Sequence, residues 1–94
     1  MRAVPAQLER LLALSEAMLA AGEAGEWERL AALGEERKAI VDSLPADLNG
    51  TLFGPEKVRA RTIIERHQVL DAKTRALIEE RQQALRVLLR EPIA

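Results

Sequence analysis

His67 is the only histidine in the chain and the side chain with the widest chemical scope. Asp71 follows it by one helical turn, and a carboxylate at that spacing can orient an imidazole for general-base catalysis. No nucleophile accompanies the pair, because Ser15 and Ser43 fall within helical patterns that lack a glycine elbow or an oxyanion site. We therefore expect His67 and Asp71 to form a surface pair, and we predict no catalytic residues and no enzyme activity.

Signals for metals and cofactors are weak as well. A lone histidine outside an HExxH-type motif is poor evidence for a metal site, and the chain has no cysteine. The five glycines stand singly or mark turns, so none belongs to a phosphate-binding loop. Glu79 and Glu80, next to Arg81, are typical of a solvated helix face. The sequence predicts neither a bound metal nor a cofactor.

The composition points to long amphipathic helices. Hydrophobic residues make up 48% of the 94 residues and charged residues 31%, with Leu, Ala, Glu and Arg dominating. No apolar run approaches the roughly 18 residues of a membrane span, and the N-terminus lacks the features of a secretory signal. We expect a cytosolic protein without membrane insertion.

Charge is distributed unevenly along the chain. Residues 1–44 carry five basic and eight acidic side chains, whereas residues 56–94 carry nine basic and six acidic ones. We interpret this asymmetry as two acidic helices packed beside a basic one. A basic helix for nucleic acid is the alternative, but acidic residues interrupt the basic ones throughout, so no direct nucleic-acid contact is expected.

Apolar periodicity predicts a single all-α domain with three helices, at about residues 5–21, 26–44 and 56–90, and a loop at 45–55. The expected fold is an antiparallel three-helix bundle with a long third helix, and completion by dimerisation remains open. Breakers set the helix ends: Gly22 is the expected left-handed residue after the first helix, and Pro45 and Pro92 stop the second and third.

The structural core is expected along the apolar stripe of the second helix and in the middle of the third. Trp27 should be its main anchor and contribute the largest apolar burial. In the loop, the apolar residues Leu48, Leu52 and Phe53 should fold back over the open end of the bundle; a mobile apolar loop waiting for a partner is the alternative. Arg37 and Gly34 interrupt the second helix, and their roles stay open. The predicted core residues are Trp27, Leu30, Leu33, Ile40 and Leu70.

Helix lengths predict an exposed end. At 1.5 Å per residue the third helix spans roughly 50 Å, against about 25–30 Å for each of the others. If it runs antiparallel along the second helix, its C-terminal half projects beyond the turn near Gly22 and Gly25. A bend or an offset of the first helix would shorten this overhang. Uncovered leucines imply a partner, which is another copy, a client helix or a missing segment. The predicted protein-binding residues are Leu77, Ile78, Arg81, Leu85, Leu88 and Leu89.

Three segments together resemble the FliT family of flagellar export chaperones. The segment GEWERLAALGEERKAIVDSL, residues 25–44, is similar to the family's Gly-Glu/Asp-Trp turn followed by spaced leucines, an arginine and a closing Ile/Val-x-x-Leu. The segments LLALSEAMLAAGEAGEW and IIERHQVLDAKTRALIEERQQAL resemble the family's first helix with its turn and a later helix. Gly34 and the 45–55 loop depart from the pattern.

The resemblance implies a cytosolic chaperone of flagellar type III export that binds the filament-cap protein FliD and prevents premature assembly. It also implies the export ATPase complex, the export gate and the regulator FlhDC as further partners. Better-known members carry an additional C-terminal helix that restrains client binding. This sequence ends at Ala94, so we expect the exposed half of the third helix to be permanently available. The alternative function is a non-catalytic, homodimeric structural or assembly protein.

Overall fold

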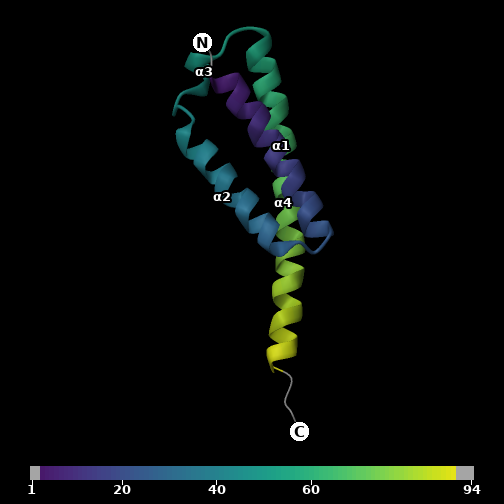
Figure 1. Ribbon diagram of the computed structural model, residues 1–94. Coiled ribbons are helices and arrows are strands. Elements are labelled where there is room, and N and C mark those ends of the chain that lie inside the picture. Colours follow the sequence, from purple (N-terminus) through teal and green to yellow (C-terminus); the bar gives the residue numbers. More distant parts are fainter. Residues whose placement is uncertain (1–2, 91–94) are drawn as a thin grey trace.

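The computed structural model describes residues 3–90, which form helices and no strand (Figure 1). Three long helices, α1 (Ala3–Glu23), α2 (Trp27–Ser43) and α4 (Pro55–Arg90), pack against one another. A one-turn helix, α3 (Leu48–Thr51), lies within the segment expected to be a loop. The predicted all-α class with a long third helix is therefore correct. Pro92, the expected end of that helix, lies outside the described residues.

Contacts between side chains define the directions of the helices. Arg10 near the start of α1 pairs with Glu36 in the second half of α2, at 2.9 Å, so these two helices run in opposite directions. Glu9 pairs with Arg59 near the start of α4, whereas Gly22 meets Leu77 further along, so α1 and α4 run in the same direction.

The backbone of α1 packs along both α2 and α4, whereas α2 and α4 approach each other less. Figure 1 shows α2 and α4 diverging toward the end of the molecule that carries α3. The sequence interpretation had α2 covering the first half of α4. In the structure most of that cover comes from α1.

The turn between α1 and α2 is closed by Gly25 rather than by Gly22. Gly25 has φ +74°, and the amide of Glu26 donates to the carbonyl of Ala21 while that of Gly25 donates to Gly22. This pair of hydrogen bonds is a Schellman motif, in which the left-handed residue follows the helix by one or two positions. The expectation that Gly22 adopts the left-handed conformation is wrong, because α1 continues through it to Glu23.

Gly22 instead allows the three long helices to meet. A methyl group on its Cα would lie 3.2 Å from the nearest carbons of both Leu30 on α2 and Leu77 on α4. That spacing is tighter than ordinary van der Waals contact. The absence of a side chain here lets α2 and α4 converge on the end of α1.

Two apolar clusters form the core, and both involve α1. The first is centred on Leu8 and Ile63, and the second on Met18 and Leu30. Ser15, which is 1% exposed, lies between them along α1. Ser15 is therefore a buried polar residue between two apolar clusters. The buried members of the first cluster are Leu8, Leu11, Leu52, Ala60 and Ile63, and those of the second are Met18, Ala21 and Leu30.

The segment after α2 covers one end of the core with a single side chain. The carboxylate of Asp47 accepts a hydrogen bond from the amide of Gly50 at 2.9 Å and caps α3. This turn directs Leu52 into the first cluster, where it is 2% exposed. Of the three apolar residues expected to cover the bundle, Leu52 is buried, Leu48 is partly buried and Phe53 is 65% exposed.

The predicted core residues fall into two groups. Leu30 and Leu70 are buried, whereas Trp27, Leu33 and Ile40 are partly buried at the margins of the clusters. Trp27 packs against the second cluster without being fully buried. It sits in the first turn of α2, at the edge of the region where the helices converge, so part of its ring stays exposed.

Candidate partner-binding surface

The C-terminal end of α4 extends beyond the packed region. Every residue from Glu79 to Arg90 is exposed, a length of about 18 Å at 1.5 Å per residue. The Cα radius of gyration is 16.9 Å, compared with about 12 Å for a compact chain of this size. Figure 1 shows α4 continuing alone past the α1–α2 turn. We call residues 79–90 the overhang.

One face of the overhang continues the core-facing side of α4. At 100° per residue, Leu85, Leu88 and Leu89 lie within a quarter turn of Ile78, which packs on the second cluster. Their side chains are 40%, 70% and 87% exposed. Val87, at 60% exposure, points to the opposite side of the helix. The stripe of Leu85, Leu88 and Leu89 is an apolar seam without cover in the described chain.

The six residues predicted to bind a protein therefore differ in environment. Leu77 and Ile78 are partly buried, the first against Gly22 and the second against the second cluster. Only the three leucines of the seam combine an apolar side chain with extensive exposure.

The sixth predicted residue, Arg81, joins the overhang to α2. Its guanidinium carbon lies 4.9 Å from the centre of the Trp27 ring. A cation in that position is attracted to the negative face of the indole, by about 0.5–1 kcal/mol at an exposed site. Sequence reasoning missed this contact, because 54 residues separate its members and no periodicity links them. The contact places the Trp27 ring beside the end of the seam that is nearer the bundle.

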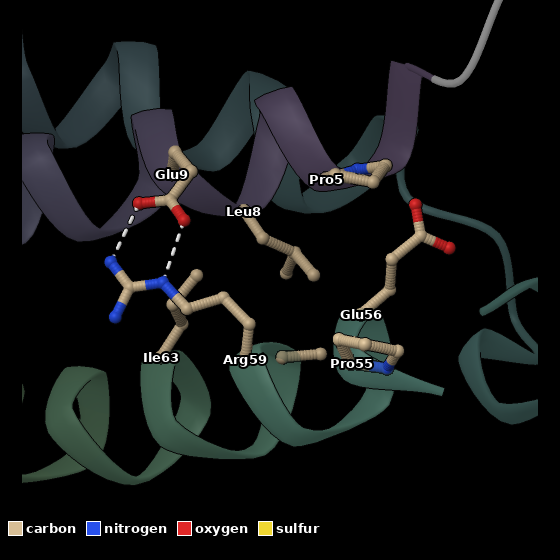
Figure 2. Close-up of a pocket in the computed structure, with 8 residues that line it drawn as sticks. Pro5, Leu8, Glu9, Pro55, Glu56, Arg59 and Ile63 are labelled. Atoms are coloured by element: carbon tan, nitrogen blue, oxygen red, sulfur yellow. Dashed lines mark hydrogen bonds and ion pairs between the residues drawn. The ribbon is translucent and has the colours of Figure 1, made fainter. Parts of the chain in front are cut away.

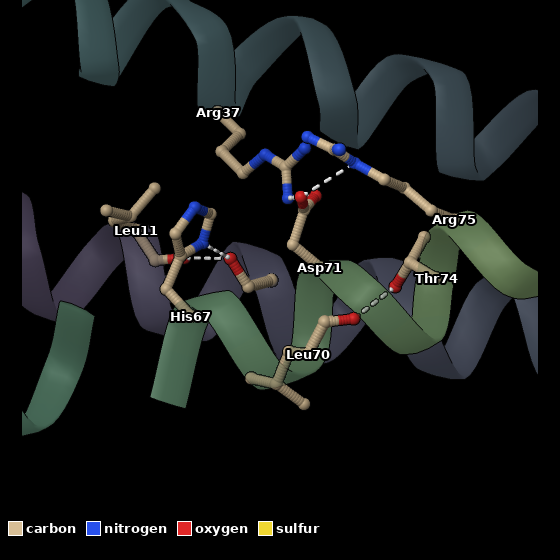
Figure 3. Close-up of polar contacts among 8 residues, drawn as sticks. Leu11, Arg37, His67, Leu70, Asp71, Thr74 and Arg75 are labelled. Carbon is tan, nitrogen blue, oxygen red and sulfur yellow. Dashed lines mark hydrogen bonds and ion pairs between the residues drawn. The ribbon is translucent and has the colours of Figure 1, made fainter. Parts of the chain in front are cut away.

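A polar junction lies deeper in the molecule, between the two clusters (Figure 3). The Ser15 hydroxyl donates to the carbonyl of Leu11 at 2.9 Å, which leaves its oxygen to accept a hydrogen bond from His67 Nδ1–H, also at 2.9 Å. The sequence paired His67 with Asp71 and found no serine for it. Here the serine is 1% exposed and already bonded to its own helix, which is the geometry of a structural contact.

Asp71 is shared by two arginines from different helices (Figure 3). Arg37 of α2 approaches it to 3.1 Å, and Arg75, one turn along α4, to 2.9 Å. Burial, followed by the positive charge of Arg37, holds the pKa of His67 below its ordinary value of 6.5, although Asp71 acts in the opposite direction. The role left open for Arg37 is thus to join α2 to α4 electrostatically.

A small cavity lies at the opposite end, between the first turns of α1 and α4 (Figure 2). It measures about 200 Å³, with the rings of Pro5 and Pro55 facing each other across it. The Glu9–Arg59 pair forms two hydrogen bonds at its rim, of 2.7 and 2.8 Å. The hydrogen bond from Arg59 is the main cause that lowers the pKa of the Glu9 carboxyl. No predicted site residue lines this cavity.

Two classes of site can be checked over residues 3–90. No three side chains of His, Asp or Glu come together there as metal ligands. None of the helices in that range combines the length and hydropathy needed to cross a bilayer. The overhang is the feature of the described chain with the clearest need for a partner, because leucines exposed to this extent are costly to hydrate.

Comparison with known proteins agrees with this geometry. The family model described as Flagellar protein FliT matches residues 5–91, which is nearly the whole chain. No curated protein and no solved structure gives a significant match. The family resemblance expected from the sequence is confirmed, and the match covers all three long helices together with the overhang. The chain belongs to the FliT family of flagellar type III export chaperones.

Proposed function

We propose that this protein acts in the cytosol as a substrate chaperone that binds the filament-cap protein FliD through the overhang of α4. The observation that carries the proposal is the exposed apolar seam of Leu85, Leu88 and Leu89. Family membership supports the export role, and the seam supplies a surface on which an amphipathic client helix can lie.

The mechanism is helix-in-groove recognition. A disordered terminus of the client would fold against the seam, with Trp27 and Arg81 at one end of the contact. Each leucine removed from water contributes roughly 1.5–3 kcal/mol. Ordering the client offsets part of that gain, by about 2–5 kcal/mol. The net affinity should be modest, which allows release at the export apparatus, while the bound segment is prevented from assembling early.

A peptide from the FliD C-terminus tests the proposal directly. We expect fluorescence anisotropy of the labelled peptide to rise on titration with the protein. Replacing Leu88 and Leu89 together by glutamine should weaken binding by at least about ten-fold, because two exposed apolar contacts are lost. Val87→Gln is the matched control, since Val87 is on the opposite side of the same turn, and it should leave affinity within about two-fold of the parent.

Two outcomes would count against FliD binding at this surface. The first is a parent protein that does not bind the peptide at high micromolar concentration. The second is equal loss of binding in the Val87 control and the leucine variant. The export ATPase complex, the export gate and FlhDC are further candidate partners of the same surface, and pull-down with these variants would sort them by their dependence on the seam.

A non-catalytic homodimer is the second candidate function. The same seam favours it, because an apolar stripe can be covered by another copy as well as by a client. Sedimentation distinguishes the two: a purely structural protein would be dimeric and would bind no FliD peptide.

A further inference from the structure

A groove of about 400 Å³ lies between α2 and α4, beside the polar junction (Figure 3). Its walls are side chains of these two helices, whose backbones approach each other less than either approaches α1. We call it the basic groove. The side chains that line it are Arg37, Lys38 and Val41 of α2 and His67, Asp71 and Arg75 of α4.

The basic groove holds more positive charge than its own carboxylate can balance. Arg37, Lys38 and Arg75 contribute three fixed positive charges, whereas Asp71 contributes one negative charge, so the net charge of the lining is +2 with His67 neutral. Lys38 is exposed and has no ion-pair partner among residues 3–90. The whole chain carries a net charge of −1. The groove is therefore a local concentration of positive charge on a protein that does not attract anions in general.

The two arginines of the groove retain donors for a second acceptor. Arg37 Nη1 lies 3.1 Å from Asp71 but is buried and makes no hydrogen bond within the described chain. Arg75 approaches the same carboxylate to 2.9 Å, and its side chain is 74% exposed. A guanidinium group has five N–H donors, so one shared carboxylate leaves most of the donors of Arg75 accessible to solvent. Figure 3 shows both guanidinium groups directed toward Asp71, one from each helix.

We propose that the basic groove binds a glutamate or aspartate side chain of an acidic protein segment, with Lys38 and Arg75 as the main contacts. Asp71 shows that a carboxylate fits between guanidinium groups at this position. Val41, which is 46% exposed, adds an apolar surface for the methylene groups of such a side chain. A free phosphate ion would leave that surface uncovered. The inference goes beyond the chaperone function, because it concerns a surface other than the seam.

His67 makes the basic groove sensitive to a bound anion. Its Nδ1 donates to Ser15 at 2.9 Å, and the pKa of the imidazole is held below its ordinary value by burial and then by Arg37. A carboxylate in the groove would offset the charge of Arg37 and raise the pKa of His67 again. The polar and charged groups around the imidazole are Ser15 of α1, Arg37 and Lys38 of α2, and Asp71 and Arg75 of α4.

Fluorescence anisotropy of a labelled hexaglutamate peptide at low ionic strength tests the groove. Lys38→Gln and Arg75→Gln should each weaken binding by about two- to five-fold, and the double variant by about ten-fold, as expected for exposed ion pairs. Lys73→Gln is the matched control, because Lys73 is exposed and lies about half a turn away from Arg75 on α4. It removes the same charge and should leave affinity within about two-fold of the parent. Equal loss in the control would overturn the inference.

The imidazole of His67 reports the position of the peptide, since the chain has only one histidine. Proton NMR titration should give a higher pKa for His67 with saturating hexaglutamate than without it, because a nearby carboxylate favours the imidazolium. An unchanged pKa would place the peptide elsewhere and refute the site. Inorganic phosphate should compete only weakly. Phosphate that binds as tightly as the peptide would make the groove a site for free anions and overturn the assignment to an acidic segment.

The two binding surfaces can be separated by the same variants. Replacing Leu88 and Leu89 by glutamine should leave hexaglutamate binding unchanged, whereas the Lys38/Arg75 double variant should still bind the FliD peptide. Loss of hexaglutamate binding in the leucine variant would place the acidic peptide on the overhang and refute the groove. A protein that binds hexaglutamate in the groove but no FliD peptide would refute the proposed chaperone function and leave this inference intact.

Discussion

Asp71 should be more important for folding than Arg37, although the two form one ion pair. Their side chains are 17% and 20% exposed, and the atoms that approach are 3.1 Å apart. Asp71 has a second partner in Arg75, which is 74% exposed. Arg37 Nη1 is buried and makes no hydrogen bond within the described chain, so its charge is balanced mainly by Asp71. The pair is therefore asymmetric.

This asymmetry determines how much unfolding free energy each substitution should cost. Asp71→Ala leaves the Arg37 guanidinium largely buried, with Arg75 nearby as a like charge, and should reduce the free energy of unfolding by about 2–4 kcal/mol. Arg37→Ala leaves Asp71 with Arg75 and partial access to water, and should cost about 1–2 kcal/mol. Removing both side chains should cost less than the sum, because the stranded charge disappears with its partner; a coupling of about 1–2 kcal/mol is expected.

Urea unfolding followed by circular dichroism at pH 7.5 measures all three variants. Arg75→Ala serves as the control and should change stability by less than about 0.5 kcal/mol, since its pair is on the surface. Equal costs for Asp71→Ala and Arg37→Ala, or additive effects in the double variant, would show that the junction is a solvated ion pair and that the reasoning from burial is wrong.

Two further predictions concern single residues in the same region. Gly34→Ala should stabilise the protein by up to about 1 kcal/mol, because alanine has the higher helix propensity. The new methyl would meet Met18 at 3.5 Å, which is ordinary van der Waals contact and causes no clash. Gly22→Ala should gain less or lose stability in the same urea assay, since two leucines lie 3.2 Å from the added carbon. The pKa of His67 is lowered in the folded state, so its contribution is complete above pH 6.5 and declines as pH falls below that value. Melting temperatures from pH 7.5 to 5 should therefore fall more steeply for the parent than for His67→Gln; parallel curves would exclude His67 as the cause.

The overhang and the polar junction show how far the sequence predicts the site. The apolar period of residues 77–89 predicts which side of α4 is apolar and needs a packing partner. The helix lengths predict that the C-terminal end of α4 extends beyond the other helices. Neither predicts that Leu77 and Ile78 are partly buried by Gly22 and the second cluster, or that Arg81 lies over Trp27. Those contacts depend on how far the helices slide and rotate against one another.

The sequence by itself determined the helices, the exposed seam of α4 and the family. Backbone propensity, helix-breaking residues and apolar spacing depend on only a few neighbouring residues, so they can be read from the sequence. The tertiary structure decided that α4 packs chiefly along α1 and that Ser15 meets His67 across 52 residues. It also decided that Gly25, not Gly22, turns the chain. Helix partners are chosen by the fit of whole faces, and a missing side chain at Gly22 brings three helices together in a way that no local pattern records.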